Sequence, residues 1–165
     1  MNRASLALFA ALLCIATASA APLSRPVTQV TIEKAKRQMT LWSGARAVKT
    51  YRVALGVNPV GHKQQEGDSR TPEGRYSIDG KNPNSSFFLS LHISYPNRSD
   101  VVAARRRGVS PGSAIMIHGM PEGLAVLNAL GLYPDWTAGC IAVSNADIKE
   151  IFSSVKVGTP IVIKP

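Results

Sequence analysis

The sequence predicts a small, mainly β domain, folded as an antiparallel sandwich or barrel. Short stretches of alternating apolar and polar residues, rich in β-branched and aromatic side chains, recur between turn residues. Stretches with helical periodicity are few and short, and strands and helices do not alternate as they do in a parallel α/β sheet. A chain of 165 residues has room for one sizeable core and little room for two.

The N-terminal segment has the pattern of a secretory signal peptide over residues 1–20. Arg3 gives a positive start, Leu6–Ala16 is apolar, and Ala18–Ala20 is a small-residue cleavage site. The apolar run is shorter than the roughly 20 residues that a bilayer span needs. We therefore expect cleavage, a single domain over residues 21–165 with no stable membrane span, and a location in the periplasm or cell envelope.

Strands are expected along most of the remaining chain. Three antiparallel strands are predicted around Val30–Ile32, Gln38–Trp42 and Val48–Leu55, with turns at Lys34–Arg37 and Ser43–Gly44. A fourth strand starts at Tyr76–Ile78, and Asp79–Gly80 is a hairpin signal that should end it. Phe87–Ser94 shows the most regular alternation and places His92 on the less apolar face. Two further strands are expected at Ala114–His118 and Pro160–Ile163.

Two short helices are predicted in the second half of the chain. Glu122–Leu130 follows a proline at a helix-entry position and precedes Gly131, a stop signal. The other helix starts at Ser144, because Ser144 and Asp147 resemble a capping box ahead of an apolar stripe formed by Ile148, Ile151, Phe152 and Val155.

The formal net charge of +9 favours anionic partners. Zinc-ligand spacing, a helix-turn-helix pattern and interleaved basic and aromatic residues are all missing, so we expect no nucleic-acid partner. Acidic cell-wall polymer or a membrane surface fits an exported chain better. The run Arg105–Arg107 is either a solvated face or a guide for such a polymer.

Cys140 is the candidate nucleophile, because Cys14 lies in the predicted signal peptide and leaves with it. A buried, inert cysteine is the alternative. The strand that ends at His118 supplies a base, and an imidazole that takes the thiol proton raises the reactive fraction of a group whose ordinary pKa is about 8.5. The carbonyl of Gly119 could hold Nδ1 and leave Nε2 to face the sulfur. The main-chain N–H groups of Gly139 and Cys140 are the expected oxyanion hole.

Four short motifs carry a resemblance to a known family: Arg70–Gly74, Leu91–Asn97, His118–Gly119 and Thr137–Cys140. Together they resemble the catalytic domain of the YkuD-type L,D-transpeptidases, which cross-link bacterial peptidoglycan. The resemblance covers nearly the whole of residues 21–165 and implies an L,D-transpeptidase-like antiparallel β-sandwich with two short helices. It implies that Cys140 is the nucleophile, that His118 is the base, and that the Gly119 carbonyl orients the imidazole.

Two positions depart from the family pattern. Ala138 stands where a histidine is usual, and Ala142 stands where an arginine is often found. Arg75, His92 or one of Arg105–Arg107 is a hypothetical replacement for holding the substrate carboxylate. We expect substrate contacts from Thr137, Trp136, His92 and Arg75.

The resemblance implies a reaction in which Cys140 forms a thioester with a peptidoglycan tetrapeptide stem, releases D-alanine and passes the acyl group to an amine, giving a 3→3 cross-link. Transfer to water would make the protein an L,D-carboxypeptidase or hydrolase, and a wall-linked lipoprotein is a further acceptor to consider. A peptidoglycan-binding module that has lost catalysis is the alternative from another class, favoured by Ala138 and Ala142. No metal or other cofactor is implied.

Overall fold

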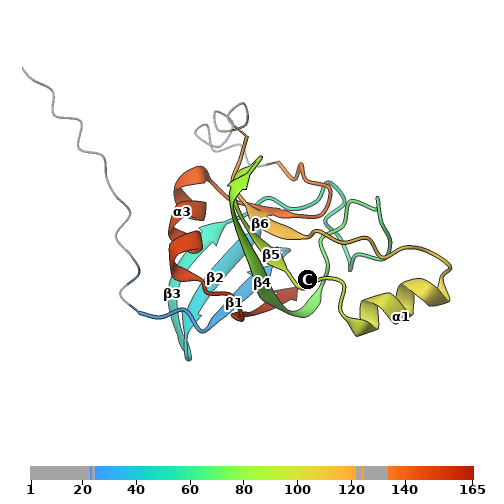
Figure 1. Ribbon diagram of the computed structural model, residues 1–165, viewed down its shortest axis with the longest axis horizontal. Coiled ribbons are helices and arrows are strands. Elements are labelled where there is room, and N and C mark those ends of the chain that lie inside the picture. The colour runs from blue at the N-terminus through green and yellow to red at the C-terminus, as the bar shows by residue number, and fades with distance from the viewer. Residues whose placement is uncertain (1–22, 24, 122–123, 125–133) are drawn as a thin grey trace, which may run out of the picture.

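The computed structural model describes residues 23, 25–121, 124 and 134–165 (Figure 1). The predicted signal peptide lies outside these residues, as does nearly all of the predicted helix Glu122–Leu130. Among the described residues, none of the helices has the length and apolar character that crossing a bilayer requires.

The described chain is mainly β, as predicted, and its strands form one sheet. The order across the sheet is β3-β2-β1-β8-β4-β5-β6-β7. These strands are β1 (Gln29–Glu33), β2 (Gln38–Ser43), β3 (Arg46–Arg52), β4 (Gly74–Ser85), β5 (Phe88–Ile93), β6 (Met116–His118), β7 (Ile141–Ala142) and β8 (Pro160–Lys164). The three predicted N-terminal strands and the closing strand are confirmed.

The sheet is mixed, which the sequence did not predict. The β1-β2-β3 meander and the β4-β5-β6 ladder are antiparallel, whereas β8 runs parallel to β1 and β7 runs parallel to β6. Both parallel pairs join segments that are distant in sequence, so no turn signal marks them. The β6-β7 pair matters most for function, because it aligns the candidate base with the candidate nucleophile.

The prediction that Asp79–Gly80 ends a strand is wrong. Strand β4 continues to Ser85, and the register with β5 shifts between Ile78 and Gly80. Turn-forming residues also suit a bulge, where an extra residue bends the strand. The bend is useful here, because the first part of β4 pairs with β8 and the later part pairs with β5.

A single apolar core fills the space between the two halves of this bent sheet. The first half contributes Val30, Ile32 and Leu41, and the second half contributes Leu91, Ile93, Ile117 and Ile141. Because side chains alternate along a strand, residues that flank these core positions in β5, β6 and β7 face away from the core. The candidate site lies on that outer face.

Among the described residues, two helices flank the sheet, and one of them was not predicted. Helix α3 (Asn145–Ser154) begins after Ser144, whose hydroxyl accepts from the main-chain N–H of Asp147, and buries Ile148 and Ile151 as expected. Helix α1 (Arg98–Arg106) begins with a complete capping box between Asn97 and Asp100. It projects from the β body (Figure 1).

Candidate active site

His118 lies at the end of β6, on the outer face of the sheet. Its neighbour Ile117 points into the core, so the imidazole points the other way. Nδ1 lies 2.6 Å from the carbonyl oxygen of Gly119, so it carries the proton and donates it to this acceptor when the ring is neutral. Burial lowers the pKa of His118 from its ordinary value, and the hydrogen bond to Gly119 opposes that shift. The side chain is thus held in place, and its burial favours the neutral imidazole.

Gly119 also meets a packing requirement. A Cβ atom at this position would lie 2.5 Å from Oδ1 of Asn145 and 2.8 Å from the carbonyl oxygen of Phe87. The Asn145 side chain cannot simply withdraw, because Oδ1 accepts the main-chain N–H of Met120 at 2.7 Å. Glycine at 119 therefore lets the main chain pass close to Phe87 and Asn145 while its carbonyl faces the imidazole.

Cys140 immediately precedes β7, which runs parallel to β6. The register pairs Ile117 with Ile141 and His118 with Ala142. Ile141 is buried in the core, so Cys140 and Ala142 face outward, on the same side as His118. The structure thus brings the predicted nucleophile and base to neighbouring strands and to one face, although 21 residues separate them in the printed sequence.

The Cys140 thiol is partly buried and interacts with the main chain. Sγ lies 3.6 Å from the carbonyl oxygen of Ala114, which has a positive φ of 59°. Burial raises the pKa of Cys140, while the main-chain N–H of Met116 and the charge of Lys63 oppose that shift. Both shifts favour the neutral thiol and the neutral imidazole over a thiolate–imidazolium ion pair. This arrangement suits transfer of the thiol proton to the imidazole while sulfur attacks the substrate.

The turn that carries Cys140 is fixed by Thr137. The Thr137 hydroxyl donates to the carbonyl oxygen of Cys140 at 2.7 Å and accepts the main-chain N–H of Gly139 at 3.1 Å. Thr137 is buried, and its main chain is bonded to Leu55 and Val57. The predicted substrate contact at Thr137 is thus next to the nucleophile, with its hydroxyl engaged in holding the turn.

Gly139 is a position that no other residue suits. Its φ is +125°, and a Cβ atom there would lie 2.6 Å from the carbonyl oxygen of Arg70. The Gly139 N–H, predicted to be part of the oxyanion hole, donates to the Thr137 hydroxyl in this structure. A substrate oxyanion would have to compete with that hydroxyl for the N–H.

Aromatic side chains enclose the imidazole. The Phe87 ring lies with its centroid 4.5 Å from that of His118 at an interplanar angle of 32°, and the Trp136 ring lies at 5.6 Å in an edge-on arrangement. The indole Nε1 of Trp136 is buried and has no hydrogen-bond partner among the residues that the structure describes. Trp136, a predicted substrate contact, is therefore a direct neighbour of the base.

The other two predicted substrate contacts differ in position. His92 pairs with Met116 in the β5-β6 ladder, so it shares the outer face with His118, and its Nδ1 lies 2.5 Å from Oδ1 of Asp79. Arg75 is exposed in the part of β4 that pairs with Val162 of β8, in the other half of the sheet. The structure brings His92 to the face of the site and does not bring Arg75 there.

Three features of the site were missed by sequence reasoning: the Ala114 carbonyl next to the thiol, the Phe87 ring on the imidazole, and the buried Lys63. The Lys63 ammonium lies 2.8 Å from Oδ1 of Asp68 and 3.0 Å from the carbonyl oxygen of Gln65. These features depend on tertiary contacts. Only the glycine-rich and lysine-rich composition of residues 58–67 marked that segment as a loop.

An ion pair secures the segment that leads into the nucleophile turn. Asp135 accepts from Nε and Nη2 of Arg37, and its Oδ1 also accepts the main-chain N–H of Leu55 at 2.8 Å. Trp136 and Thr137 follow at once and bond to the carbonyl of Leu55. Arg37 is thus a remote support for the position of Cys140.

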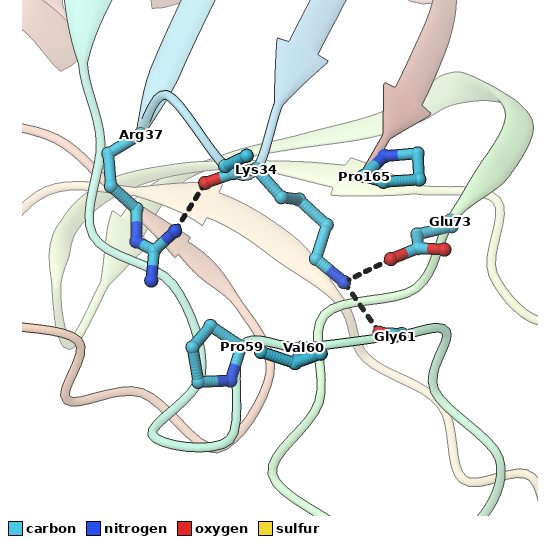
Figure 2. Close-up of a pocket in the computed structure, with 8 residues that line it drawn as sticks. Lys34, Arg37, Pro59, Val60, Gly61, Glu73 and Pro165 are labelled. Carbon is cyan, nitrogen blue, oxygen red and sulfur yellow. Dashed lines mark hydrogen bonds and ion pairs between the residues drawn. The ribbon is translucent and has the colours of Figure 1, made fainter.

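A pocket of about 160 Å³ lies beside Arg37 of this ion pair (Figure 2). Its buried cation, Lys34, donates to the carbonyl oxygens of Gly61 and Thr71 and to the Glu73 carboxylate, at 2.6, 2.9 and 2.8 Å. An ammonium group has three protons, and all three are engaged here, so Lys34 has no donor to offer a ligand. Burial lowers the pKa of Lys34. The hydrogen bonds of Lys34 therefore connect the loop before β4 to the end of β1.

These observations define a class: a β domain in which a cysteine before one strand and a histidine at the end of its parallel neighbour share one face. The chain belongs to the YkuD family of L,D-transpeptidase catalytic domains, because the family model matches residues 28–163. YafK of Escherichia coli (strain K12), whose name provisionally ranks it among the L,D-transpeptidases, is 31% identical over 108 residues, which cover 64% of this chain and 36% of that protein.

Solved structures show the same fold. The helical cell shape determining protein Pgp2 of Campylobacter jejuni has a TM-score of 0.65 and 24% identity, over 86% of this chain and 48% of that one. L,D-transpeptidase 3 of Mycobacterium tuberculosis, solved with a faropenem-derived adduct, has a TM-score of 0.56 and 15% identity, over 85% and 61%. The chain thus spans about a third of the curated relative and about half of the Campylobacter protein.

Proposed function

We propose that the protein is an exported peptidoglycan L,D-transpeptidase with Cys140 as nucleophile. The observation that carries the proposal is the placement of Cys140 and His118 on one face of two paired strands, with the imidazole fixed by the Gly119 carbonyl. Nδ1 is engaged at that carbonyl, so Nε2 is the nitrogen left to take the thiol proton. Membership of the YkuD family supports a peptidoglycan substrate.

The first half-reaction forms a thioester. His118 takes the Cys140 proton as sulfur attacks the carbonyl carbon of the third residue of a tetrapeptide stem. The bond to the terminal D-alanine nitrogen then breaks, and His118 returns the proton to that leaving amine. In the second half-reaction an amine of a neighbouring stem attacks the thioester and loses a proton to His118, and the thiol is restored.

The tetrahedral intermediate needs hydrogen-bond donors near its oxyanion. We assign this role to the main-chain N–H groups of Cys140 and Gly139. Gly139 serves only if its N–H turns from the Thr137 hydroxyl toward the substrate oxygen, a movement that substrate binding would have to compensate. Loss of one such donor typically slows a reaction about a hundredfold or more.

Binding of the stem is assigned to the surroundings of the site. Trp136 borders the base, Thr137 holds the turn, and His92 lies on the same outer face two strands away from β7. Arg75 lies in the other half of the sheet, so His92 is the better candidate to replace the usual family histidine and arginine near the substrate carboxylate.

Water and other amines compete as acyl acceptors. Transfer to water would give tripeptide stems, and an amine of a wall-linked lipoprotein would give a protein–wall link. The distinction depends on which acceptor reaches the thioester, so product analysis decides it.

The test is intact-mass spectrometry of the protein incubated with a disaccharide-tetrapeptide, combined with analysis of the products. We expect a thioester adduct on the wild type, 3→3 dimers among the products, and neither with Cys140→Ala. Tripeptide without dimers would replace the transpeptidase assignment by a hydrolase. Binding to wall material with neither adduct nor product would replace it by a binding module.

A further inference from the structure

Helix α1 presents a face of arginines to solvent. Arg98, Arg105 and Arg106 are exposed, whereas Asp100 and Ala104 are buried on the opposite side. At 3.6 residues per turn, the three arginines lie within roughly 100° of the helix circumference. We call Arg98, Arg105 and Arg106 the arginine face. It lies on an element that projects from the β body (Figure 1).

Helix stability accounts for only part of this face. Arg105 and Arg106 are in the last turn, where a cation suits the helix dipole, but Arg98 is in the first turn, where a cation opposes it. Adjacent Arg105 and Arg106 repel one another. The acid of the helix, Asp100, is directed inward, where it accepts from the Tyr76 hydroxyl at 3.0 Å and from the main-chain N–H of Asn97 at 2.9 Å. No arginine of the face forms an ion pair with an acidic side chain within the part of the chain that the structure describes.

The end of α1 that carries Arg105 and Arg106 is fastened to the loop bordering the nucleophile. Arg107 donates from Nη2 to the carbonyl oxygen of Gln64 at 2.7 Å. The main-chain N–H of Glu66 donates to the carbonyl oxygen of Ser110 at 2.8 Å. This loop continues to Arg70, whose carbonyl closely approaches Gly139. The C-terminal end of α1 is therefore linked through this loop to the turn that carries Cys140.

We propose that the arginine face of α1 docks the carboxylate-bearing peptidoglycan polymer outside the stem that reacts at Cys140. This inference rests on the proposed function for the identity of the polymer. Guanidinium groups suit carboxylates because they can donate two parallel hydrogen bonds. A membrane surface fits less well, since Val102 is the one large hydrophobic residue exposed on α1 and the helix has no aromatic residue.

The experiment compares binding to purified, lipid-free sacculi by co-sedimentation, in a Cys140→Ala background so that no reaction intervenes. One variant changes all three residues of the arginine face to Gln. The matched control changes three exposed cations outside α1 to Gln and so removes the same net charge. These are Arg46 in β3, Lys164 in β8, and Lys156 between α3 and β8. Circular dichroism and thermal melts verify that both variants are folded.

We expect the arginine-face variant to bind sacculi about tenfold more weakly at low salt and to show a weaker salt dependence, with little change for the control. Amidation of the sacculus carboxylates should remove the difference between the two variants. Equal losses in both variants would overturn the inference, because only net charge would then matter. A loss confined to anionic phospholipid vesicles would also overturn it. Absence of an adduct on wild-type protein with the soluble disaccharide-tetrapeptide counts against the proposed function and leaves the binding result standing.

Discussion

At the scale of single residues, burial shifts the pKa values of the candidate base and the candidate nucleophile. It lowers the pKa of His118 and raises the pKa of Cys140, so both shifts favour the neutral thiol and the neutral imidazole. Phe87 contributes to the burial of the imidazole by lying against its face. Lys63 and the N–H of Met116 reduce the shift at sulfur, so they help the thiolate as it forms.

The acid limb of a plot of kcat/KM against pH, where the rate rises with pH, should report the lowered pKa of His118. A general base is active when unprotonated, so acyl-enzyme formation rises with pH through the pKa of His118, and that rise should occur below the ordinary value of about 6.5. Phe87→Ala exposes the ring and should move the limb to higher pH. The measurement is kcat/KM against pH for both proteins. A limb above pH 6.5 in the wild type, or no movement in the variant, contradicts this account.

Gly139→Ala tests whether the nucleophile turn needs a close approach as well as a positive φ. The conformational cost of φ > 0 is about 1–2 kcal/mol, and the clash with the Arg70 carbonyl adds about 1–3 kcal/mol. Gly158→Ala is the matched control, because Gly158 has a φ of +91° and nothing within 4 Å of the added Cβ. Urea unfolding should show the larger loss of stability for Gly139→Ala. Equal losses would mean that the Arg70 contact is relieved without cost.

The residues whose chemistry is local could be predicted from the sequence. Cys140 and His118 were singled out by residue type and by the strand and glycine patterns around them, and the structure places them on one face. The Phe87 ring and the Lys63 charge were not predicted. Each reaches the site through a tertiary contact from a distant segment, and no spacing in the sequence encodes that contact.

At the scale of elements, the errors arise where one residue pattern fits two structures. Asp79–Gly80 fits a hairpin turn or a bulge, and the pairing of β4 with both β8 and β5 selects the bulge. Helix α1 did carry a signal, since Asn97 and Asp100 have the spacing of a capping box. Arg105–Arg107 were interpreted as either a solvated face or a guide for an acidic polymer. Their exposure agrees with both interpretations, and the helix was not predicted.

The Arg37–Asp135 pair should stabilise the segment that leads to Cys140. Asp135→Ala removes the partner of Arg37 and leaves the N–H of Leu55 without its acceptor, a cost of about 1–3 kcal/mol. Glu33→Ala is the control, because it breaks the more exposed pair with Lys36, which contributes about 0–1 kcal/mol. Denaturant titration of both variants provides the comparison. Similar small losses would show that the Arg37–Asp135 pair carries no special weight.

At the scale of the whole molecule, the sheet is continuous, but some strands that are neighbours in the sheet are far apart in the sequence. Strand β8 comes from the C-terminal end of the chain and lies between β1 and β4. Composition and periodicity could predict a mainly β domain with one core. They could not predict which strands are neighbours, because the β1-β8 and β6-β7 pairs are selected by packing among distant segments.

The common core predicts that both halves of the sheet unfold together. The chain has two tryptophans, and they report on different regions: Trp42 lies in β2, and Trp136 lies beside His118. Trp42→Phe and Trp136→Phe therefore give two single-tryptophan proteins. Within each, the fluorescence midpoint in urea should coincide with the midpoint from far-UV circular dichroism, because one apolar cluster spans both halves.

A core substitution in these two backgrounds makes the test sharper. Ile78→Ala empties a fully buried position where β4 passes from one half of the sheet to the other, and it should cost about 2–5 kcal/mol by both tryptophan probes. Val157→Ala, at an exposed residue, should change stability by about 0.5 kcal/mol or less. If Ile78→Ala lowered the midpoint reported by one tryptophan and not the other, the two halves would be separate cooperative units. The position of Cys140 relative to His118 would then depend on the β5-β6-β7 half alone.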